Sequence, residues 1–269
     1  MQRRSVSLFT GLALAGCLLA PASHAANCGN TSQGFNDWKH SFASTAKRAG
    51  VKTAGLQALA SAQYASKTIA ADRNQKSFRY TLDKFLKIRG AETIVAQGRR
   101  RKAKDAAFYA ALEKRYGVPA GVIIAIHGME TGFGHFMGDS NVVSAIVTLT
   151  YDCRRSDFFR PHAIAALKLV DQGSLSATTK GARHGEVGHT QFLPANVLKY
   201  GVDGNGDGRV DLTNRLDALT STANFLRKKG WAKGKPYQEG QPNFKVIKKW
   251  NAATVYQQAI ALMAERIDR

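Results

Sequence analysis

Apolar residues recur at helical spacing through most of this chain, and this pattern constrains the fold more than any other feature. One face of the first predicted helix is formed by Phe35, Trp38, Phe42 and Ala46. The same spacing predicts helices around residues 78–86, 105–116, 158–171, 214–229 and 253–267. No segment alternates apolar and polar residues for long enough to require a large sheet, and no internal repeat is present. The 269 residues are therefore predicted to form a mainly α globular protein, in which the Gly- and Pro-rich segment 230–242 is a surface loop or a connection between lobes.

One predicted helix is apolar along most of its length and ends with a single carboxylate. Gly117 is a typical stop for the helix before it, and Pro119 suits its first turn. The residues after Pro119 read AGVIIAIHGMETGFG, in which Glu130 is the only acid. An apolar setting raises the pKa of a carboxyl group, so Glu130 would stay protonated near neutral pH and donate its proton to a leaving group. The alternative is a Glu that reaches solvent at the helix end, and the spacing alone leaves both readings open.

The N-terminus has the composition of an export signal. Arg3 and Arg4 precede an apolar run over 6–19, and the small residues of 22–25 offer a cleavage site, which predicts a signal peptide over residues 1–25. Two alternatives remain. The first is an uncleaved anchor, although the run is short for a membrane span. The second is a lipoprotein signal that ends at Cys17, but the apolar run continues past this cysteine. The sequence therefore predicts an exported, periplasmic protein, with lipid anchoring or secretion as open variants.

The chain is strongly basic. Cleavage after Ala25 removes two arginines and no acid, which changes the formal net charge from +20 to +18. Such a charge favours an anionic partner, either nucleic acid, a membrane surface or an acidic polymer. The basic run 99–104 is predicted to be a solvated helix face or loop rather than a nucleic-acid site, because no nucleic-acid-binding motif accompanies it. For an exported protein the charge suits a cell wall or an outer-membrane surface.

Two cysteines, Cys28 and Cys153, remain after signal cleavage. An even number in an oxidising compartment favours a disulfide, and two unrelated buried thiols are the alternative. Closing so long a loop would stabilise the fold by about 4–5 kcal/mol in the chain-entropy model.

The most specific local motif is an acidic, glycine-rich loop that begins at Asp203. It follows the calcium-loop pattern, with Gly208 at the sharp turn. The expected oxygen ligands are Asp203, Asn205, Asp207, the carbonyl of Arg209, Asp211 and Asn214. Because an Asn replaces the usual bidentate Glu at the last position, we expect weak, structural calcium binding. The alternative is a turn that binds no metal.

Motifs of several other enzyme classes are absent. The seven histidines form neither an H-E-x-x-H motif nor a Cys/His cluster, and the chain has no G-x-S-x-G elbow and no Walker loop. These absences weigh against a metalloprotease, an esterase and an NTPase.

Five segments in the same order resemble the membrane-bound lytic transglycosylase B family of the lysozyme-like lytic murein transglycosylases. They are YGVPAGVIIAIHGMETGFG (116–134), NVVSAIVTLTYDCRR (141–155), GEVGHTQFLP (185–194), the loop at 203–214 and NFKVIKKWNAATVYQQAIALMAERI (243–267). The resemblance is strongest over 75–267 and implies that residues 26–269 form a lysozyme-like catalytic region with an inserted EF-hand-like calcium loop. The residues around Cys28 and Cys153 resemble the cysteine pair of one branch of the family, which favours the disulfide.

The resemblance also implies an activity and a site. Glu130 matches the single catalytic acid and base, whereas Gln191, Trp250, Asn251 and Tyr256 match residues that bind the glycan. The expected reaction cleaves the bond between N-acetylmuramic acid and N-acetylglucosamine in peptidoglycan, forms a 1,6-anhydro ring and requires no cofactor. The expected partner is the glycan strand, with no nucleic acid, and the protein is expected to be a monomer. A lysozyme-type hydrolase and a non-catalytic basic wall-binding protein are the alternatives.

Two residues near these motifs carry further hypotheses. His127 lies about one helical turn before Glu130 and would tune its pKa, although packing explains this histidine equally well. Glu186 would be a second catalytic carboxylate, but a structural or exposed Glu is the preferred reading. Ala253 stands where the family usually has Ser, and residues 182–186 depart from its small or apolar pattern.

Overall fold

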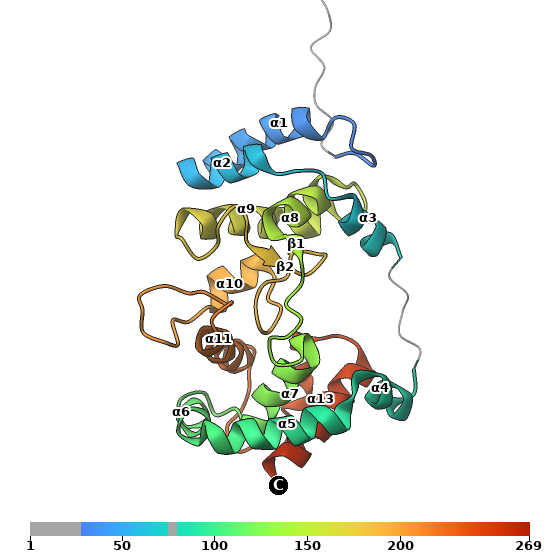
Figure 1. The fold of residues 1–269 in the computed structure, drawn as a ribbon, viewed down its shortest axis with the longest axis vertical. Coiled ribbons are helices and arrows are strands. Elements are labelled where there is room, and N and C mark those ends of the chain that lie inside the picture. Colours follow the sequence, from blue (N-terminus) through green and yellow to red (C-terminus); the bar gives the residue numbers. More distant parts are fainter. Residues whose placement is uncertain (1–27, 75–79) are drawn as a thin grey trace, which may run out of the picture.

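A computed structural model describes residues 28–74 and 80–269, which form thirteen helices and one short strand pair (Figure 1). The predicted mainly α fold is therefore confirmed. The predicted signal peptide, Cys17 and Phe78 lie outside the described residues. Among the helices described, none combines the length and the apolar character that crossing a membrane requires.

The upper end of the molecule in Figure 1 is a helical layer with its own apolar core. It comprises α1 (Phe35–Arg48), α2 (Thr53–Ser61), α3 (Ser66–Arg73), α8 (Val142–Tyr151) and α9 (Ser156–Asp171). The four residues predicted to form the buried face of the first helix are all buried in this core. A disulfide joins Cys28 to Cys153, as predicted. Beside it, the N–H of Gly29 donates to the carbonyl of Tyr151 at 2.9 Å, so the bond ties the start of the described chain to the end of α8.

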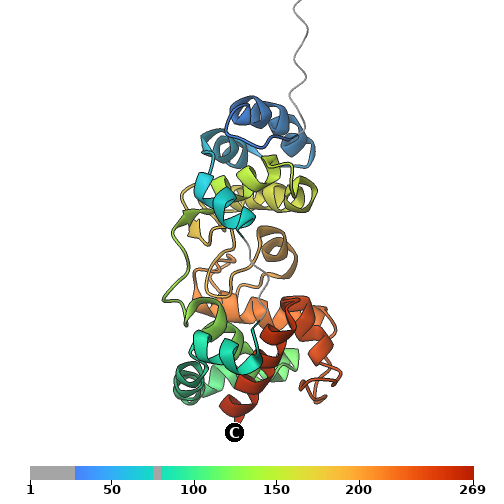
Figure 2. The ribbon, with the colours of Figure 1, turned by 90° about the vertical axis from the view of Figure 1, so that its right-hand side faces the viewer.

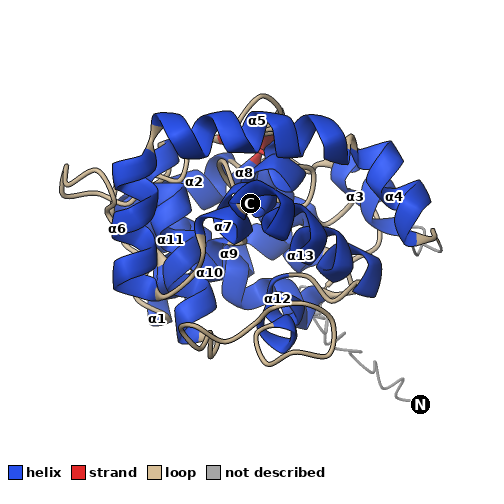
Figure 3. Ribbon diagram, turned by 90° about the horizontal axis from the view of Figure 1, so that it is seen from below, coloured by secondary structure: helices blue, strands red, loops and turns tan. Residues whose placement is uncertain are grey.

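The lower end contains the second and larger core, which surrounds α7 (Ala120–Thr131) (Figure 3). Its other helices are α4 (Leu82–Arg89), α5 (Ala91–Lys104), α6 (Ala106–Tyr116), α11 (Arg215–Lys228), α12 (Phe244–Trp250) and α13 (Thr254–Asp268). Residues 122–126 of α7 are completely buried, as expected for a helix that is apolar on every side. Gly121 allows α13 to approach closely, because a Cβ atom there would lie 2.3 Å from the carbonyl oxygen of Ala264.

Between the upper layer and α7 lie α10 (Pro194–Tyr200) and a two-stranded antiparallel pair, β1 (Ser140–Asn141) and β2 (Lys180–Gly181) (Figures 1 and 2). Val197 and Tyr200 of α10 belong to the larger core. α8 links the cores at its start, since Val142 belongs to the larger core and Val143 to the smaller one. The long loops on both sides of α10 bring residues 182–196 and the acidic loop next to the larger core.

The predicted helix boundaries agree with the structure to within a few residues. α6 ends at a left-handed Gly117, Pro119 directly precedes α7, and the side chain of Asn214 caps α11. Segment 230–242 contains no helix, as predicted. The basic run 99–104 forms the end of α5 and is mostly exposed, which agrees with a solvated helix face.

Candidate active site

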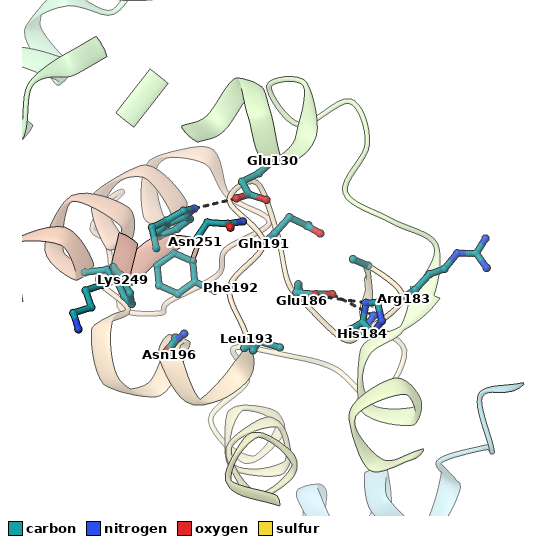
Figure 4. A pocket seen from close by; sticks show the side chains of 13 residues that line it. Glu130, Arg183, His184, Glu186, Gln191, Phe192, Leu193, Asn196, Lys249 and Asn251 are labelled. Atoms are coloured by element: carbon teal, nitrogen blue, oxygen red, sulfur yellow. Dashed lines mark hydrogen bonds and ion pairs between the residues drawn. The ribbon is translucent and has the colours of Figure 1, made fainter. Parts of the chain in front are cut away.

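Glu130 lies on the last turn of α7, where two cavities meet. The first cavity has a volume of about 490 Å³ and is shown in Figure 4. Its lining comprises Glu130, Ala182, Arg183, His184, Glu186, Gln191, Phe192, Leu193, Asn196, Phe225, Lys249, Trp250 and Asn251. The second cavity, of about 530 Å³, reaches Glu130 from the side of α4 and α5. A polymer that crosses both cavities would pass directly over this carboxyl group.

Two donors hold one oxygen of the Glu130 side chain. The hydroxyl of Tyr256 donates to Oε1 at 2.6 Å, and Nε1 of Trp250 donates to the same atom at 3.0 Å. The hydrogen bonds found among the described residues engage Oε1 alone, so Oε2 is left for a proton. The carboxyl group is thus fixed in orientation while one oxygen remains available to a substrate.

The surroundings of Glu130 favour its neutral form. Burial raises the pKa of the Glu130 carboxyl above its ordinary value, and the charge of Glu186 adds to this increase. The hydrogen bonds from Tyr256 and Trp250 and the charge of Arg89 act in the opposite direction without cancelling it. Burial, followed by the nearby Glu130 carboxylate, also raises the pKa of Tyr256 well above 10.0, so its hydroxyl remains a donor. A protonated carboxyl group in a cleft is the arrangement that a general acid needs.

Gln191 lines the same cavity as Glu130 and lies in a tight turn of the loop before α10 (Figure 4). Its backbone has a φ of 54°, in the left-handed region that non-glycine residues seldom adopt. Its side-chain nitrogen donates to the carbonyl of Gly188 at 2.8 Å and to that of Met137 at 3.3 Å. The turn and these two bonds fix the amide group at the edge of the cleft.

The remaining predicted site residues come from the junction of α12 and α13. Trp250 ends α12 and packs edge-on against Phe192 at 5.3 Å. Asn251 lines the cavity, and its Oδ1 accepts the N–H of Ala253 at 3.0 Å. Tyr256 is buried beneath Glu130. The structure therefore brings together all the residues that the family resemblance places at the site.

Several cleft residues were missed by sequence reasoning. Lys249 and Asn196 line the first cavity, and Arg89 lies beside Glu130, where it donates to the carbonyl of Met129 at 2.6 Å. Lys249 directly precedes Trp250, so its neighbourhood was visible in the sequence. No sequence signal connects Asn196 or Arg89 to Glu130, because only the tertiary fold brings them together.

Glu186 lines the same cavity as Glu130 and belongs to a charged cluster. Its Oε2 accepts a hydrogen bond from the backbone N–H of His184 at 3.2 Å. The His184 ring also lies 3.8 Å from Asp72, a buried carboxylate that pairs with Arg154 and Arg155. These contacts place Glu186 beside His184 at the wall of the cleft, and the choice between a structural and a catalytic role stays a prediction.

His127 contacts His189, and no hydrogen bond joins it to Glu130 among the described residues. Its Nε2 lies 3.0 Å from Nδ1 of His189, and it is not among the groups that shift the pKa of Glu130. The geometry does not support the predicted tuning role and instead connects His127 to the turn that carries Gln191.

The acidic loop is closed by its own backbone. Asp203 accepts hydrogen bonds from the N–H groups of Gly206, Asp207 and Gly208. Oδ1 of Asn214 accepts the N–H of Leu216 and caps α11, so this oxygen is already engaged. Sequence reasoning missed Asp217, a fully buried carboxylate that accepts three backbone N–H groups of the loop, those of residues 204, 205 and 211.

The chemistry of the loop can be compared with what a metal requires. Within residues 28–74 and 80–269, no three His, Cys, Asp or Glu side chains are grouped closely enough to hold a metal ion. The donors of the loop are carboxylate, amide and carbonyl oxygens, which are the type that calcium prefers. Their chemistry fits this ion.

Comparison with known proteins agrees with this geometry. The sequence model of a protein family, the transglycosylase SLT domain, matches residues 34–241. Membrane-bound lytic murein transglycosylase B of Escherichia coli is 36% identical over 121 residues, which are 44% of this chain and 34% of that protein. The matched part thus spans only about a third of the curated relative.

Solved structures show the same fold. SltB3 from Pseudomonas aeruginosa superposes with a TM-score of 0.80 and 28% identity, over 86% of this chain and 79% of that one. The lytic transglycosylase Slt35 of Escherichia coli superposes with a TM-score of 0.76 and 20% identity, over 93% and 98% of the two chains. Because the domain model covers most of the sequence, the chain belongs to the SLT-domain transglycosylase family, whose lysozyme-like fold it shares.

Proposed function

We propose that this protein is a lytic murein transglycosylase that cleaves the β-1,4 bond between N-acetylmuramic acid and N-acetylglucosamine in peptidoglycan. The observation that carries the proposal is the environment of Glu130, a carboxyl group with a raised pKa that two donors orient in an open cleft. The related SltB3 was crystallised with NAG-NAM-pentapeptide, a fragment of this polymer.

In the first step, Glu130 acts as an acid. Its proton passes to the glycosidic oxygen, the bond to the anomeric carbon of the muramoyl residue breaks, and N-acetylglucosamine leaves with a free hydroxyl group. The N-acetyl group of the muramoyl residue stabilises the positive charge at the anomeric carbon. Tyr256 and Trp250 then stabilise the Glu130 carboxylate through their hydrogen bonds to Oε1.

In the second step, Glu130 acts as a base. The carboxylate takes the proton of the muramoyl 6-hydroxyl, whose oxygen bonds to the anomeric carbon and closes the 1,6-anhydro ring. Glu130 is protonated again, and no water is consumed. Because nucleophile and electrophile belong to one molecule, correct orientation alone lowers such barriers by about 7–11 kcal/mol in the best cases. This explains how one carboxyl group suffices where most glycosidases use two.

Mass spectrometry of digested peptidoglycan tests the proposal. We expect anhydromuropeptides from the wild type, no products from Glu130→Gln, and normal activity from Glu113→Gln, which alters an exposed glutamate on α6. Products that end in reducing muramic acid would instead assign a lysozyme-type hydrolase. The presence of Glu186 in the same cavity is the observation that keeps this second function in view.

A wall-binding protein without activity is the third candidate. The formal net charge of +20 favours attachment to an anionic wall. Equal clearing of peptidoglycan by the wild type and Glu130→Gln would exclude Glu130 as the catalyst, and binding without any products from either protein would favour this candidate.

We further propose that the acidic loop binds calcium as a structural ion. Asp203, Asn205, Asp207 and Asp211 would hold it with the carbonyl of Arg209, and Slt35, which has the same fold, was crystallised with calcium. A ligand at 100 times its Kd stabilises the folded state by about 2.7 kcal/mol. We therefore expect millimolar calcium to raise the Tm of the wild type and not that of Asp203→Asn, with magnesium as the control ion.

The place of action follows from the substrate. We propose that the protein is exported to the periplasm, where it works as a monomer on glycan strands. Its curated relative is named as membrane-bound, and the basic surface suits attachment to an anionic wall or membrane. Cell fractionation followed by mass determination of the mature N-terminus would test the export and the lipid anchor together.

A further inference from the structure

Two histidines lie behind the catalytic cleft and connect the two segments that carry Glu130 and Gln191. His127 is on α7, one turn before Glu130, and only 1% of it is exposed. His189 precedes Gln191 by two residues in the turn of the long loop. Nε2 of His127 lies 3.0 Å from Nδ1 of His189, and the two rings are nearly perpendicular, at 71°.

The Nδ1 atom of His127 determines the direction of this hydrogen bond, because it is buried and has no hydrogen-bond partner among the described residues. A neutral imidazole has one donor nitrogen and one acceptor nitrogen. A proton on Nδ1 of His127 would be a buried N–H without an acceptor, which is costly. The proton of His127 is therefore on Nε2, and His127 donates to Nδ1 of His189. Nδ1 of His189 is then the acceptor, and the proton of that ring is on Nε2.

Both rings are held in the neutral form that this direction requires. Burial lowers the pKa of His127 to about 3, and the neighbouring His189 and the charges of Arg101 and Arg215 act in the same direction. Burial also lowers the pKa of His189. At neutral pH the pair therefore shares one defined arrangement of protons.

Other contacts around His189 involve α7, the residues directly after it and the acidic loop. The Thr131 hydroxyl on α7 donates to the carbonyl of His189 at 2.7 Å and accepts the N–H of Gly134 at 2.9 Å. The N–H of His189 donates to the carbonyl of Leu212 at 3.0 Å. Gly134 leaves just enough space for the ring, because a Cβ atom there would lie 2.3 Å from the His189 imidazole. His189 is thus enclosed by α7, the residues after it and the end of the acidic loop.

We propose that His127 and His189 are positioning residues whose directed hydrogen bond, from His127 to His189, holds the Gln191 turn against the end of the Glu130 helix. This inference rests on the proposed function. A loosened turn would let Gln191 move away from Glu130 and admit water to the anomeric carbon. The pair would then affect the rate of the chemical step and the nature of the product more than substrate affinity.

Long-range proton–nitrogen NMR of the wild-type protein tests the direction without any need for activity. We expect both rings to be neutral at pH 7 and to carry their proton on Nε2. A proton on Nδ1 of either ring, or a charged ring, would overturn the inference. Because this spectrum does not depend on catalysis, it separates a failure of the inference from a failure of the proposed function.

Four substitutions test the consequence. His127→Gln and His189→Asn retain a donor and an acceptor near the original nitrogens, whereas His127→Met and His189→Leu remove them at similar volume. A net hydrogen bond contributes about 1 kcal/mol, so we expect kcat to fall about fivefold in each apolar variant and the share of reducing-end products to rise, with KM nearly constant.

The amide variants should recover most of kcat, and His40→Leu, which alters an exposed histidine on α1, should behave as the wild type. Unchanged kcat and products in a folded His189→Leu would refute the inference. If His189→Leu does not fold, His127→Met decides by the same criteria.

Discussion

The Tyr256 hydroxyl lies 2.6 Å from Oε1 of Glu130, and this short contact joins the first turn of α13 to the last turn of α7. The hydroxyl group keeps its proton, because its pKa is well above 10.0, and it donates this proton to Oε1. It therefore stabilises the carboxylate more than the neutral acid. Tyr256 thus supports the second step of the proposed reaction, in which Glu130 is a base, while burial supports the first.

Removal of this donor should slow the reaction and move its pH profile. A hydrogen bond to a charged group contributes about 1.5–3 kcal/mol, so Tyr256→Phe is expected to lower kcat about tenfold to a hundredfold. Because the Tyr256 bond lowers the pKa of Glu130, its loss raises that pKa. The fall of kcat/KM at alkaline pH, which reports loss of the Glu130 proton, should then move to higher pH.

The matched control for this measurement is Tyr237→Phe, which removes a buried hydroxyl group outside both cavities. It should leave the profile unchanged. If the alkaline fall of kcat/KM occurs at the same pH in Tyr256→Phe as in the wild type, this hydrogen bond does not change the pKa of Glu130.

Replacement of Glu186 is expected to move the alkaline fall of kcat/KM in the opposite direction. Its negative charge raises the pKa of Glu130, so Glu186→Gln should lower that pKa and bring the alkaline fall of kcat/KM to lower pH. The effect should be smaller than that of Tyr256→Phe, because Glu186 contributes least among the groups that shift this pKa. A complete loss of activity in Glu186→Gln would instead identify it as a second catalytic carboxylate.

Glu130→Gln should be more stable than the wild type, by an amount that increases with pH. Burial raises the pKa of Glu130 in the folded protein above 4.5, the ordinary value that it has in the unfolded chain. Between the unfolded-state pKa and the folded-state pKa, the unfolded chain therefore binds fewer protons than the folded protein. Stability is then lost as pH rises through this window, at about 1.4 kcal/mol for each unit of difference. Glutamine avoids the loss, and its oxygen can still accept both hydrogen bonds.

Urea unfolding at pH 4 and pH 8 would measure this difference. The two proteins should be nearly equal in stability at pH 4 and separate at pH 8, whereas Glu113→Gln should follow the wild type at both values. A difference that does not vary with pH would mean that Glu130 has the same pKa in the folded and unfolded states.

Periodicity predicted most of the long helices of this fold, together with α4, but missed α5, α8 and the remaining short helices. α5 has 14 residues, but its apolar spacing ends at Gly98, because the residues after it are mostly basic. α8 is buried on every side, so its apolar run shows no period. The face of Phe35, Trp38 and Phe42 was recognised because α1 has 14 residues and thus repeats its pattern. α10 and α12 have seven residues each, too few to show a period, and their positions follow from tertiary packing. A strand pair of two residues per strand leaves no alternation to detect.

The site residues differ in the same way: those in local motifs were predicted, and those brought together by the tertiary fold were not. Glu130 and Gln191 stand in contiguous motifs, so they were identified from the resemblance. The contact of His127 with His189 spans 62 residues, and neither histidine belongs to a recognisable ligand pattern. Asp217 lies beyond the last position of the calcium-loop pattern, and only the backbone path of the loop brings its carboxylate to residues 204 and 211. Contacts that depend on how distant segments fold together are not encoded in local spacing.

The disulfide offers a test of stability that should leave the chemistry unchanged. Cys28 and Cys153 are 125 residues apart, so their bond restricts a large part of the unfolded chain. In the chain-entropy model, its removal costs about 5 kcal/mol. The double variant Cys28→Ala/Cys153→Ala should lose about this amount of unfolding free energy in urea. Its kcat should change less than twofold, because the bond lies beside Tyr151 of the upper core, whereas Glu130 lies on α7, in the lower part of the molecule.

Reduction provides the control for that measurement. Dithiothreitol should destabilise the wild type to the level of the double variant and leave the variant itself unaffected. Equal stability of the oxidised wild type and the variant would mean that the unfolded chain is already compact enough for the crosslink to restrict nothing. The backbone hydrogen bonds of Gly29 with Tyr151 and Cys153 would then be sufficient to hold the N-terminal segment against α8.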